Sequence, residues 1–150
     1  MLLKEKIESN FRDLTSFGGY MVLFPLIIFI YLINLKDLAF QLLLAFVVTY
    51  MIILIIRLFY FKERPVKERY NTFLSRIDSA SFPSGHSART ISFALIFVDY
   101  FKNNVLTLFL IILVLFVCYS RIYLKKHYWN DVIVGLFIGI ITALFILIYL

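Results

Sequence analysis

The two histidines of this sequence, His86 and His127, are its best candidates for chemistry, because imidazole can act as a nucleophile or an acid near neutral pH. Asp131 follows His127 by four residues, so on the first turn of a helix the two side chains share a face. A carboxylate hydrogen-bonded to one ring nitrogen would fix the tautomer and leave the other nitrogen free to attack. A purely structural His–Asp pair has the same spacing, so the spacing alone does not show whether His127 is catalytic.

A second candidate group lies in the segment SFPSGHS, residues 81–87. Pro83 and Ser84 are typical of a helix start, and Gly85 lets the backbone come close to a ligand. The free N–H groups at such a start, together with the helix dipole, can hold a phosphate, and His86 would lie at the edge of that pocket. A helix cap followed by a surface histidine would explain the segment nearly as well.

Three arginines could supply positive charge to the same reaction. Arg57 lies inside an apolar run, Arg64 follows seven residues later, and Pro65 then ends any helix. If that run lies in a membrane, an arginine there costs roughly 2.5–3.5 kcal/mol and needs a compensating partner, which an anionic substrate could be. Arginines whose heads reach the interface would also explain this segment. Arg121 lies six residues before His127.

These groups indicate one kind of reaction only when they are considered together. Arg57, Arg64 and Arg121 supply positive charge, Ser84 and the Gly85 amide supply neutral donors, and the two histidines supply a nucleophile and an acid. Phosphoryl transfer needs this inventory, because its catalysis consists mainly of positioning and of stabilising charge on the phosphoryl oxygens.

The elements that must position these residues are membrane helices. The chain has 150 residues and is 63% hydrophobic and 16% charged, far more apolar than a soluble domain. Its net charge of +6 is not accompanied by the soluble basic surface of a nucleic-acid module, so anionic lipid is the expected partner. Cys118, the only cysteine, is expected to pack in the interior and can form no intramolecular disulfide.

The apolar stretches predict an all-α bundle that forms a single membrane-embedded domain over residues 1–150. An amphipathic interfacial helix is expected at residues 1–16, with Leu3, Ile7 and Phe11 on its apolar face. A polar loop, residues 61–83, is expected to cover the site, and Gly135 and Gly139 predict close packing of the last helix within the chain. About five spanning helices are expected, at residues 17–34, 38–60, 84–101, 105–123 and 132–150.

Threading five spans brings the end of the second and fourth helices, and the beginning of the third and fifth, to one face of the membrane. All the candidate residues therefore share that face. The links at residues 35–37 and 102–104 are tight, so the helices that they join are expected to be antiparallel neighbours.

The motifs closely resemble those of the type 2 phosphatidic acid phosphatase superfamily of lipid phosphatases, whose signature is K-x6-RP, PSGH and SR-x5-H-x3-D. Here the corresponding segments are Arg57-x6-Arg64-Pro65, Pro83-Ser84-Gly85-His86 and Ser120-Arg121-x5-His127-x3-Asp131. The chain departs from the signature at Arg57, where the family usually has lysine, and in its expected number of spans, since many members have six.

The resemblance implies a role for each matching residue. His127 would attack phosphorus to form a phosphohistidine, Asp131 would orient it, and His86 would protonate the leaving oxygen and then help to activate water. The phosphate would be held by side chains and amides that make a metal or other cofactor unnecessary: Arg57, Arg64, Ser84, Gly85 and Arg121.

Two other functions fit parts of the sequence. A metal-dependent hydrolase could use His86, His127 and Asp131 as ligands, although the nearby arginines would disfavour a cation. A non-enzymatic channel, transporter or lipid-binding protein would explain the helices but not the spacing of the motifs. No obligate protein partner is evident.

The resemblance implies a bulky anionic lipid as substrate: lipid A, phosphatidylglycerol phosphate or undecaprenyl diphosphate. Further basic residues near the site favour a substrate with more than one phosphate: Lys62, Lys67, Arg69, Arg76, Lys125 and Lys126.

The expected location is the inner (plasma) membrane. Only Lys36 and Lys102 would lie opposite the site, which leaves 13 of the 15 basic residues on its own side and predicts a cytoplasmic face. The family resemblance implies the periplasmic or outer face, which we adopt as the expectation.

Overall fold

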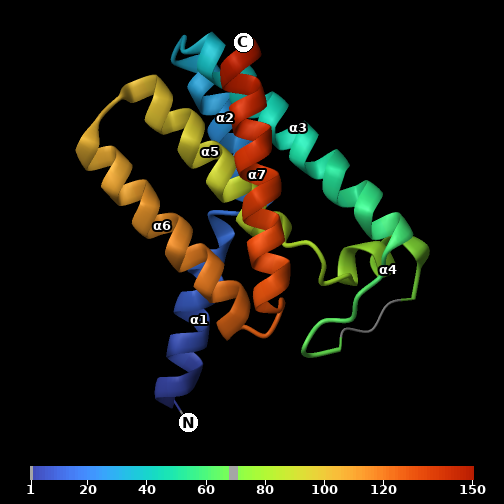
Figure 1. Cartoon of the computed structure of the whole chain (residues 1–150). Helices are drawn as coiled ribbons and strands as arrows, with labels where there is room; N and C mark the ends of the chain where they lie inside the picture. Colours follow the sequence, from blue (N-terminus) through green and yellow to red (C-terminus); the bar gives the residue numbers. More distant parts are fainter. Residues whose placement is uncertain (1, 68–70) are drawn as a thin grey trace.

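The fold is a bundle of helices, as predicted, in a computed structural model that describes residues 2–67 and 71–150 (Figure 1). Within those residues the regular structure is entirely helical. The seven helices are α1 (Leu2–Ser16), α2 (Tyr20–Leu32), α3 (Lys36–Phe59), α4 (Phe73–Ser79), α5 (Gly85–Phe101), α6 (Asn104–Tyr123) and α7 (Trp129–Tyr149).

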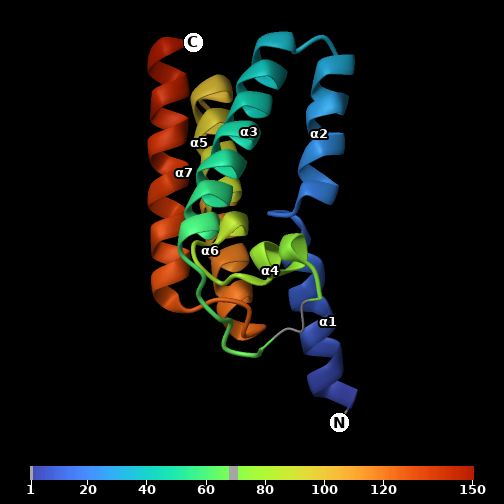
Figure 2. The ribbon, with the colours of Figure 1, turned by 90° about the vertical axis from the view of Figure 1, so that its right-hand side faces the viewer.

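Helix α5 lies at the centre of the bundle and packs against α3, α6 and α7, while α2 packs on the outer side of α3 (Figures 1 and 2). The turns after α2 and α5 are short and contain residues of positive φ, Asn34 (66°) and Lys102 (46°), which reverse the chain within a few residues. Asn103 then caps α6 by accepting a hydrogen bond from the Leu106 N–H at 2.9 Å. The two helix pairs predicted to be antiparallel neighbours are confirmed.

The contact between α5 and α7 depends on the two glycines of α7. A Cβ atom at Gly135 would lie 2.5 Å from the Ser84 carbonyl oxygen, and one at Gly139 would overlap the carbonyl of Ala88. The predicted packing of this glycine pair within the chain is confirmed. It also fixes the first turn of α5 against α7, where the candidate residues lie.

The apolar core occupies the end of the bundle away from the candidate residues. Its fully buried members include Leu38 and Leu42 of α3 and Ile96 of α5, packed with Ile146 of α7. The opposite end has most of the buried polar residues of the described chain, among them His127 and Asp131. The bundle therefore has an apolar half that stabilises the fold and a polar half that can bind a polar ligand.

The helices differ in length from the five predicted spans. Three of the described helices, α3, α6 and α7, are long and apolar enough to cross a membrane, and the pair Glu5–Ser16 and Tyr20–Leu32, bent by 42°, would make a fourth. Helix α2 alone has 13 residues, which at ~1.5 Å per residue is shorter than the ~30 Å hydrocarbon core. Helix α5 has 17 residues and is shielded by its neighbours.

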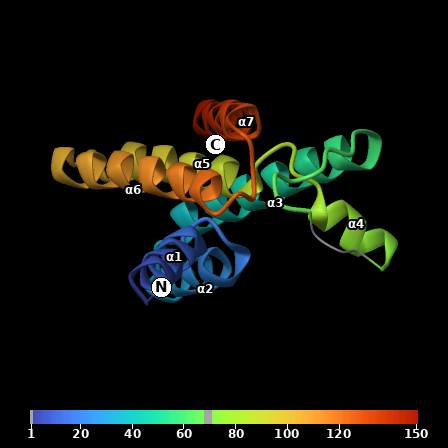
Figure 3. The same cartoon turned by 90° about the horizontal axis from the view of Figure 1, so that it is seen from below.

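Helix α1 packs against α6, and the view from below shows it beside α2 (Figure 3). The Phe11 ring lies 4.3 Å from the Tyr123 ring, centroid to centroid. The predicted helical character of residues 1–16 is thus confirmed over Leu2–Ser16, while its place at the membrane surface stays a prediction. Met1, the side chain of Leu3 and residues 68–70 of the predicted polar loop lie outside the described part.

Candidate active site

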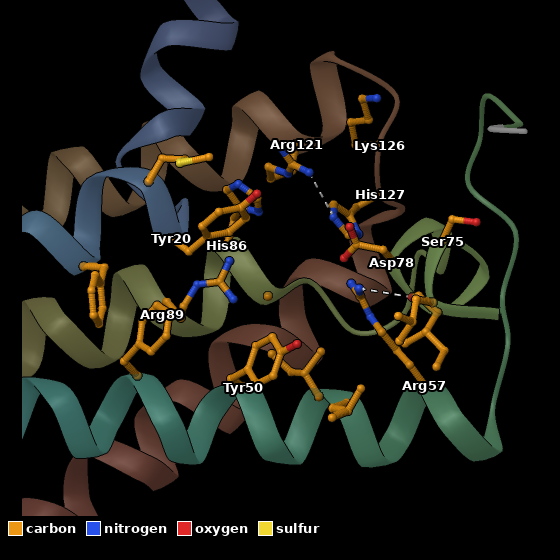
Figure 4. Close-up of a pocket in the computed structure, with 18 of the residues that line it drawn as sticks. Tyr20, Tyr50, Arg57, Ser75, Asp78, His86, Arg89, Arg121, Lys126 and His127 are labelled. Carbon is orange, nitrogen blue, oxygen red and sulfur yellow. Dashed lines mark hydrogen bonds between the residues drawn. The ribbon is translucent and has the colours of Figure 1, made fainter. Parts of the chain in front are cut away.

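Most of the predicted site residues line one cavity of about 990 Å³ (Figure 4). They come from the end of α3, the start of α5, the end of α6 and the turn before α7, which the bundle topology brings together. The lining includes six of the eight predicted residues: Arg57, Arg64, Gly85, His86, Arg121 and His127. Ser84 and Asp131 lie behind this lining, and each is 0% exposed.

His127 is 2% exposed and has both ring nitrogens engaged. Its Nδ1 lies 2.5 Å from the carbonyl oxygen of Ser81, which can only accept, so Nδ1 has the hydrogen and donates. Nε2 therefore has a lone pair, and it lies 3.3 Å from Nη2 of Arg121. The tautomer needed for attack through Nε2 is fixed by the backbone.

The prediction that His127 donates a hydrogen bond directly to the Asp131 carboxylate is wrong. The Asp131 Oδ2 lies 3.9 Å from His127 Nδ1, beyond hydrogen-bond distance, because other donors saturate the carboxylate. Its Oδ2 accepts from the Ser81 hydroxyl and, at 2.8 Å, from the Tyr128 N–H, while Oδ1 accepts from Lys62 Nζ at 2.6 Å. Asp131 is thus linked to His127 through Ser81, whose hydroxyl donates to the carboxylate and whose carbonyl accepts from the imidazole.

Ser81 and Lys62 are site residues that the sequence motifs did not indicate. Lys62 lies 4.5 Å above the Tyr128 ring and forms an ion pair with Asp131, so it neutralises this carboxylate instead of adding charge for a substrate. Lys67 is likewise paired, with Glu63 at 3.0 Å. The contacts of Ser81 and Lys62 with Asp131 could not be read from the sequence, because they depend on how the loop after α3 folds back onto α7.

Replacing Asp131 with asparagine is expected to reduce kcat only about 10- to 100-fold, because the Ser81 carbonyl still selects the reactive tautomer. A carboxylate bonded directly to the imidazole would predict a loss on the order of 10⁴-fold. Steady-state kinetics on the purified variant measure this difference. A Lys62→Met variant is the matched control for loss of the ion pair alone, and a loss near 10⁴-fold in Asp131→Asn would contradict the indirect role.

The side chains of Arg57 and Arg64 hold the polar loop over the cavity. Arg57 donates from Nη2 to the Pro83 carbonyl at 3.0 Å, and Arg64 donates from Nη2 to the Asp78 carbonyl at 2.7 Å. Ser75 and Asp78 of the loop line the cavity. The Nε of Arg57 is buried and has no hydrogen-bond partner among the described residues, which leaves an N–H donor for an anion.

The start of α5 is built as the SFPSGHS segment predicts, with one difference. Ser84 caps the helix, since its Oγ accepts from the Ser87 N–H at 3.4 Å, and its own N–H donates to the Asp131 carbonyl at 2.9 Å. Its hydroxyl oxygen is therefore engaged in the first turn of α5 and does not line the cavity. Its predicted contact with phosphate remains a prediction. Gly85 does line the cavity, and a Cβ there would lie 3.1 Å from Nη1 of Arg89.

His86 lies beneath the bend between α1 and α2. A Cβ at Gly18 would lie 3.0 Å from the His86 Cβ, and one at Gly19 would lie 3.6 Å from the His86 Nε2. These two glycines let the chain pass close over the imidazole. Arg89, one turn further along α5, donates from Nε to the Gly18 carbonyl at 3.1 Å and lines the same cavity.

The surroundings of His127 keep its imidazole neutral at pH 7. Burial, and next the positive charge of Arg121, lower the pKa of His127 well below 6.5, although the hydrogen bond to Ser81 opposes this shift. Since only the neutral imidazole can attack, kcat/KM is expected to fall with decreasing pH only below 6.5. A pH–rate profile, corrected for titration of the substrate phosphate, measures this limb. A His127-dependent midpoint at or above 6.5 would contradict the assignment.

The three residues that a metal-dependent hydrolase would use do not form a metal site. Within the described part of the chain, no three His, Cys, Asp or Glu side chains are grouped so that they could hold an ion. The Nδ1 of His127 is occupied by a carbonyl, and Asp131 is occupied by Lys62. Basic side chains surround the cavity instead.

Comparisons with known proteins agree with this geometry. The structure is similar to the crystal structure of Aquifex aeolicus LpxE, with a TM-score of 0.79 and 28% identity over 95% of this chain and 86% of that chain. It also shares its fold with a PAP2-type phosphatidylglycerolphosphate phosphatase from Bacillus subtilis, with a TM-score of 0.77 and 21% identity over 95% of this chain and 76% of that one.

A lipid A 4'-phosphatase of Porphyromonas gingivalis is 39% identical over 65 residues, which is 43% of this chain and 28% of that relative's length. The sequence model of the PAP2 superfamily matches residues 38–150, a range that includes all three motifs. The resemblance inferred from the motifs is thereby confirmed, and the chain belongs to the PAP2 superfamily.

Proposed function

We propose that the chain hydrolyses the phosphomonoester, or the terminal phosphate of a diphosphate, of a bulky anionic lipid through a phosphohistidine on His127. One observation carries the proposal: a single cavity joins the arginine and histidine cluster to an apolar wall. The wall consists of side chains from α2 and α3 that suit a lipid tail: Tyr20, Met21, Phe24, Pro25, Phe46, Ile53 and Leu54.

The chemistry proceeds in two displacements. The Nε2 of His127 attacks phosphorus, the bond to the leaving oxygen breaks, and His86, which takes up a proton as the anionic phosphate binds beside it, donates that proton to the leaving oxygen. A water molecule then gives a proton to His86 as its oxygen attacks phosphorus, and the P–N bond breaks to release phosphate. Through both steps Nδ1 of His127 keeps its hydrogen bond to Ser81.

The arginines supply the charge stabilisation for both displacements. The Arg121 guanidinium is 3.3 Å from the attacking nitrogen, and the buried Nε of Arg57 has a hydrogen to donate to a phosphoryl oxygen. These side chains, with Arg64 and the Gly85 amide, would do the work that a metal ion does in other phosphatases. We therefore propose that the reaction requires no metal or cofactor.

The relatives' names suggest which lipids to test first. One relative is a lipid A 4'-phosphatase and another a phosphatidylglycerolphosphate phosphatase, and the motif resemblance adds undecaprenyl diphosphate. All three present a terminal phosphate on a bulky anionic lipid. Among the basic residues expected to select a polyphosphorylated lipid, Lys126 lines the cavity, whereas Arg69 lies outside the described residues.

The proposal is tested by phosphate release from a panel of these lipids and phosphatidic acid, using detergent-purified protein. Turnover of at least one lipid is expected to be unaffected by EDTA and to be inhibited by vanadate, which mimics pentacoordinate phosphorus. Activity that EDTA abolishes and zinc or magnesium restores would contradict the mechanism. Lipid binding without phosphate release from any of them would favour the non-enzymatic alternative.

We propose that the site opens on the periplasmic or outer face of the inner membrane, following the family rather than the distribution of basic residues. Single cysteines at residues 67 and 76, introduced into a Cys118→Ser background, would report the face of the loop. Labelling of intact cells by a membrane-impermeant maleimide is the expected result. Labelling only after the cells are opened would place the site in the cytoplasm.

A further inference from the structure

Arg89 is a buried charge that the reacting phosphate does not explain. Its side chain is 7% exposed, and its guanidinium lies 5.9 Å above the Phe46 ring. The one hydrogen bond that it makes among the described residues runs from Nε to the neutral Gly18 carbonyl. No carboxylate in that part of the chain forms an ion pair with it, and the opposite charge of Asp78 acts on it only from beyond ion-pair distance.

Arg89 lies between the histidine pair, His86 and His127, and the apolar wall of the cavity. Phe46 precedes Arg57 by eleven residues on α3, which corresponds to about 16 Å along a helix axis. In Figure 4 the Arg89 guanidinium points into the cavity between His86 and Tyr50. A ligand that reaches from His127 towards the apolar wall would therefore pass Arg89.

The charge of the cavity also exceeds what one phosphate needs. Five basic side chains line it, and Asp78 is the one acidic residue in the described lining. A phosphate reacting at His127 lies beside Arg121 and the buried Nε of Arg57, so it leaves the buried charge of Arg89 for a second anionic group of the ligand to compensate.

We propose that Arg89 binds a second phosphate of the substrate, the one that lies between the reacting phosphate and the lipid tail. The leaving group is then itself a lipid phosphate, and Arg89 selects lipid diphosphates over lipid monophosphates. The planar fork of the guanidinium suits two oxygens of such a phosphate. This inference rests on the proposed function and specifies its substrate class.

The test compares a polyprenyl diphosphate with the monophosphate of the same tail. The wild type is expected to prefer the diphosphate, and Arg89→Gln is expected to lower kcat/KM for it about 10- to 100-fold, the usual value of hydrogen bonds to a charged group. For the monophosphate the change is expected to be less than about threefold, because the reacting phosphate keeps all its other ligands. The retained monophosphate activity also reports that the variant is folded.

Two further variants control for charge and for structure. Arg89→Lys keeps the charge but not the fork, and it is expected to recover part of the diphosphate preference. Arg12→Gln makes the same change on α1, where the exposed Arg12 side chain pairs with Glu8 at 4.0 Å outside the cavity lining, and is expected to affect neither substrate.

The outcomes separate the inference from the proposed function. An equal loss on both substrates would mean that Arg89 only holds the Gly18 bend over His86, and it would overturn the inference. No loss on either substrate would overturn it too. A wild type that releases phosphate from the monophosphate but not from the diphosphate would also overturn it, whereas one that releases phosphate from no lipid would instead overturn the proposed function.

Discussion

Replacing His127 with alanine is expected to lower kcat for phosphate release on the order of 10⁴-fold or more, the size of effect seen when a nucleophile is removed. The remaining arginines still bind substrate, so KM should change far less than kcat. Steady-state phosphate release in detergent measures both constants. A melting curve of the same sample checks that the buried site still folds.

The matched control is His86→Ala, which removes the same side chain from the other side of the cavity. A general acid contributes about 10²- to 10⁴-fold, and its contribution depends on how badly the leaving oxygen needs a proton. His86→Ala should therefore recover much of its loss in kcat/KM, which reports the first phosphoryl-transfer step, with an aryl phosphate that has an acidic leaving group. His127→Ala should stay inactive with both substrates, and comparable recovery in both variants would contradict the assignment of nucleophile and acid.

Replacing Arg121 with alanine is expected to lower kcat about 10²- to 10³-fold, the usual cost of removing one oxyanion donor. Its Nη2 lies 3.3 Å from His127 Nε2, so it is adjacent to the phosphoryl group throughout the transfer. The same change should raise the pKa of His127, because the second largest cause of its lowering would be gone. The acid limb of the pH–rate profile should accordingly move to higher pH.

Two variants show whether Arg121 acts on the phosphate or only supports the fold. Thr15→Val removes the hydroxyl that accepts from Arg121 Nη1 at 2.8 Å, and its effect is expected to be below about fivefold. Arg121→Lys keeps the charge, but it loses the fork and should recover only part of the activity. A kcat that is unchanged in Arg121→Ala while KM rises would show that the residue binds substrate and transition state equally.

The helical class and the convergence of the motifs were predictable from the sequence, because each rests on local patterns. The apolar stretches locate the helices to within a few residues, and threading them across a membrane brings His86 and His127 to the same end. The glycine pair of α7 was predictable for the same reason, since Gly135 and Gly139 lie one turn apart on one face.

The contacts that fix the imidazole were not predictable, because they depend on tertiary placement of a loop. Asp131 has the spacing to bond His127 directly, yet Ser81 and Lys62 approach from the loop and occupy its oxygens. The sequence leaves the role of Arg89 open for a similar reason. Its position near a helix start fits both an interfacial arginine and a ligand, and only the Gly18 contact and the cavity distinguish them.

Helix lengths show a further limit of sequence patterns. A run of about 20 apolar residues predicts a span, but the break at Gly18 and Gly19 bends the chain by 42° and leaves α2 with 13 residues. The close approach of these glycines to His86 and Thr90 explains the break, since larger side chains would collide with α5. Hydropathy cannot report such a contact.

The most direct measurement is the identification of a covalent intermediate. His86→Ala should accumulate phosphoenzyme from an activated aryl phosphate, because its first step needs no acid while its second step lacks the group that activates water. After a rapid alkaline quench, peptide mass spectrometry should find an acid-labile phosphate on His127, which an added His127→Ala change abolishes. Turnover in which no peptide has the label, or in which another residue has it, would contradict the phosphohistidine mechanism.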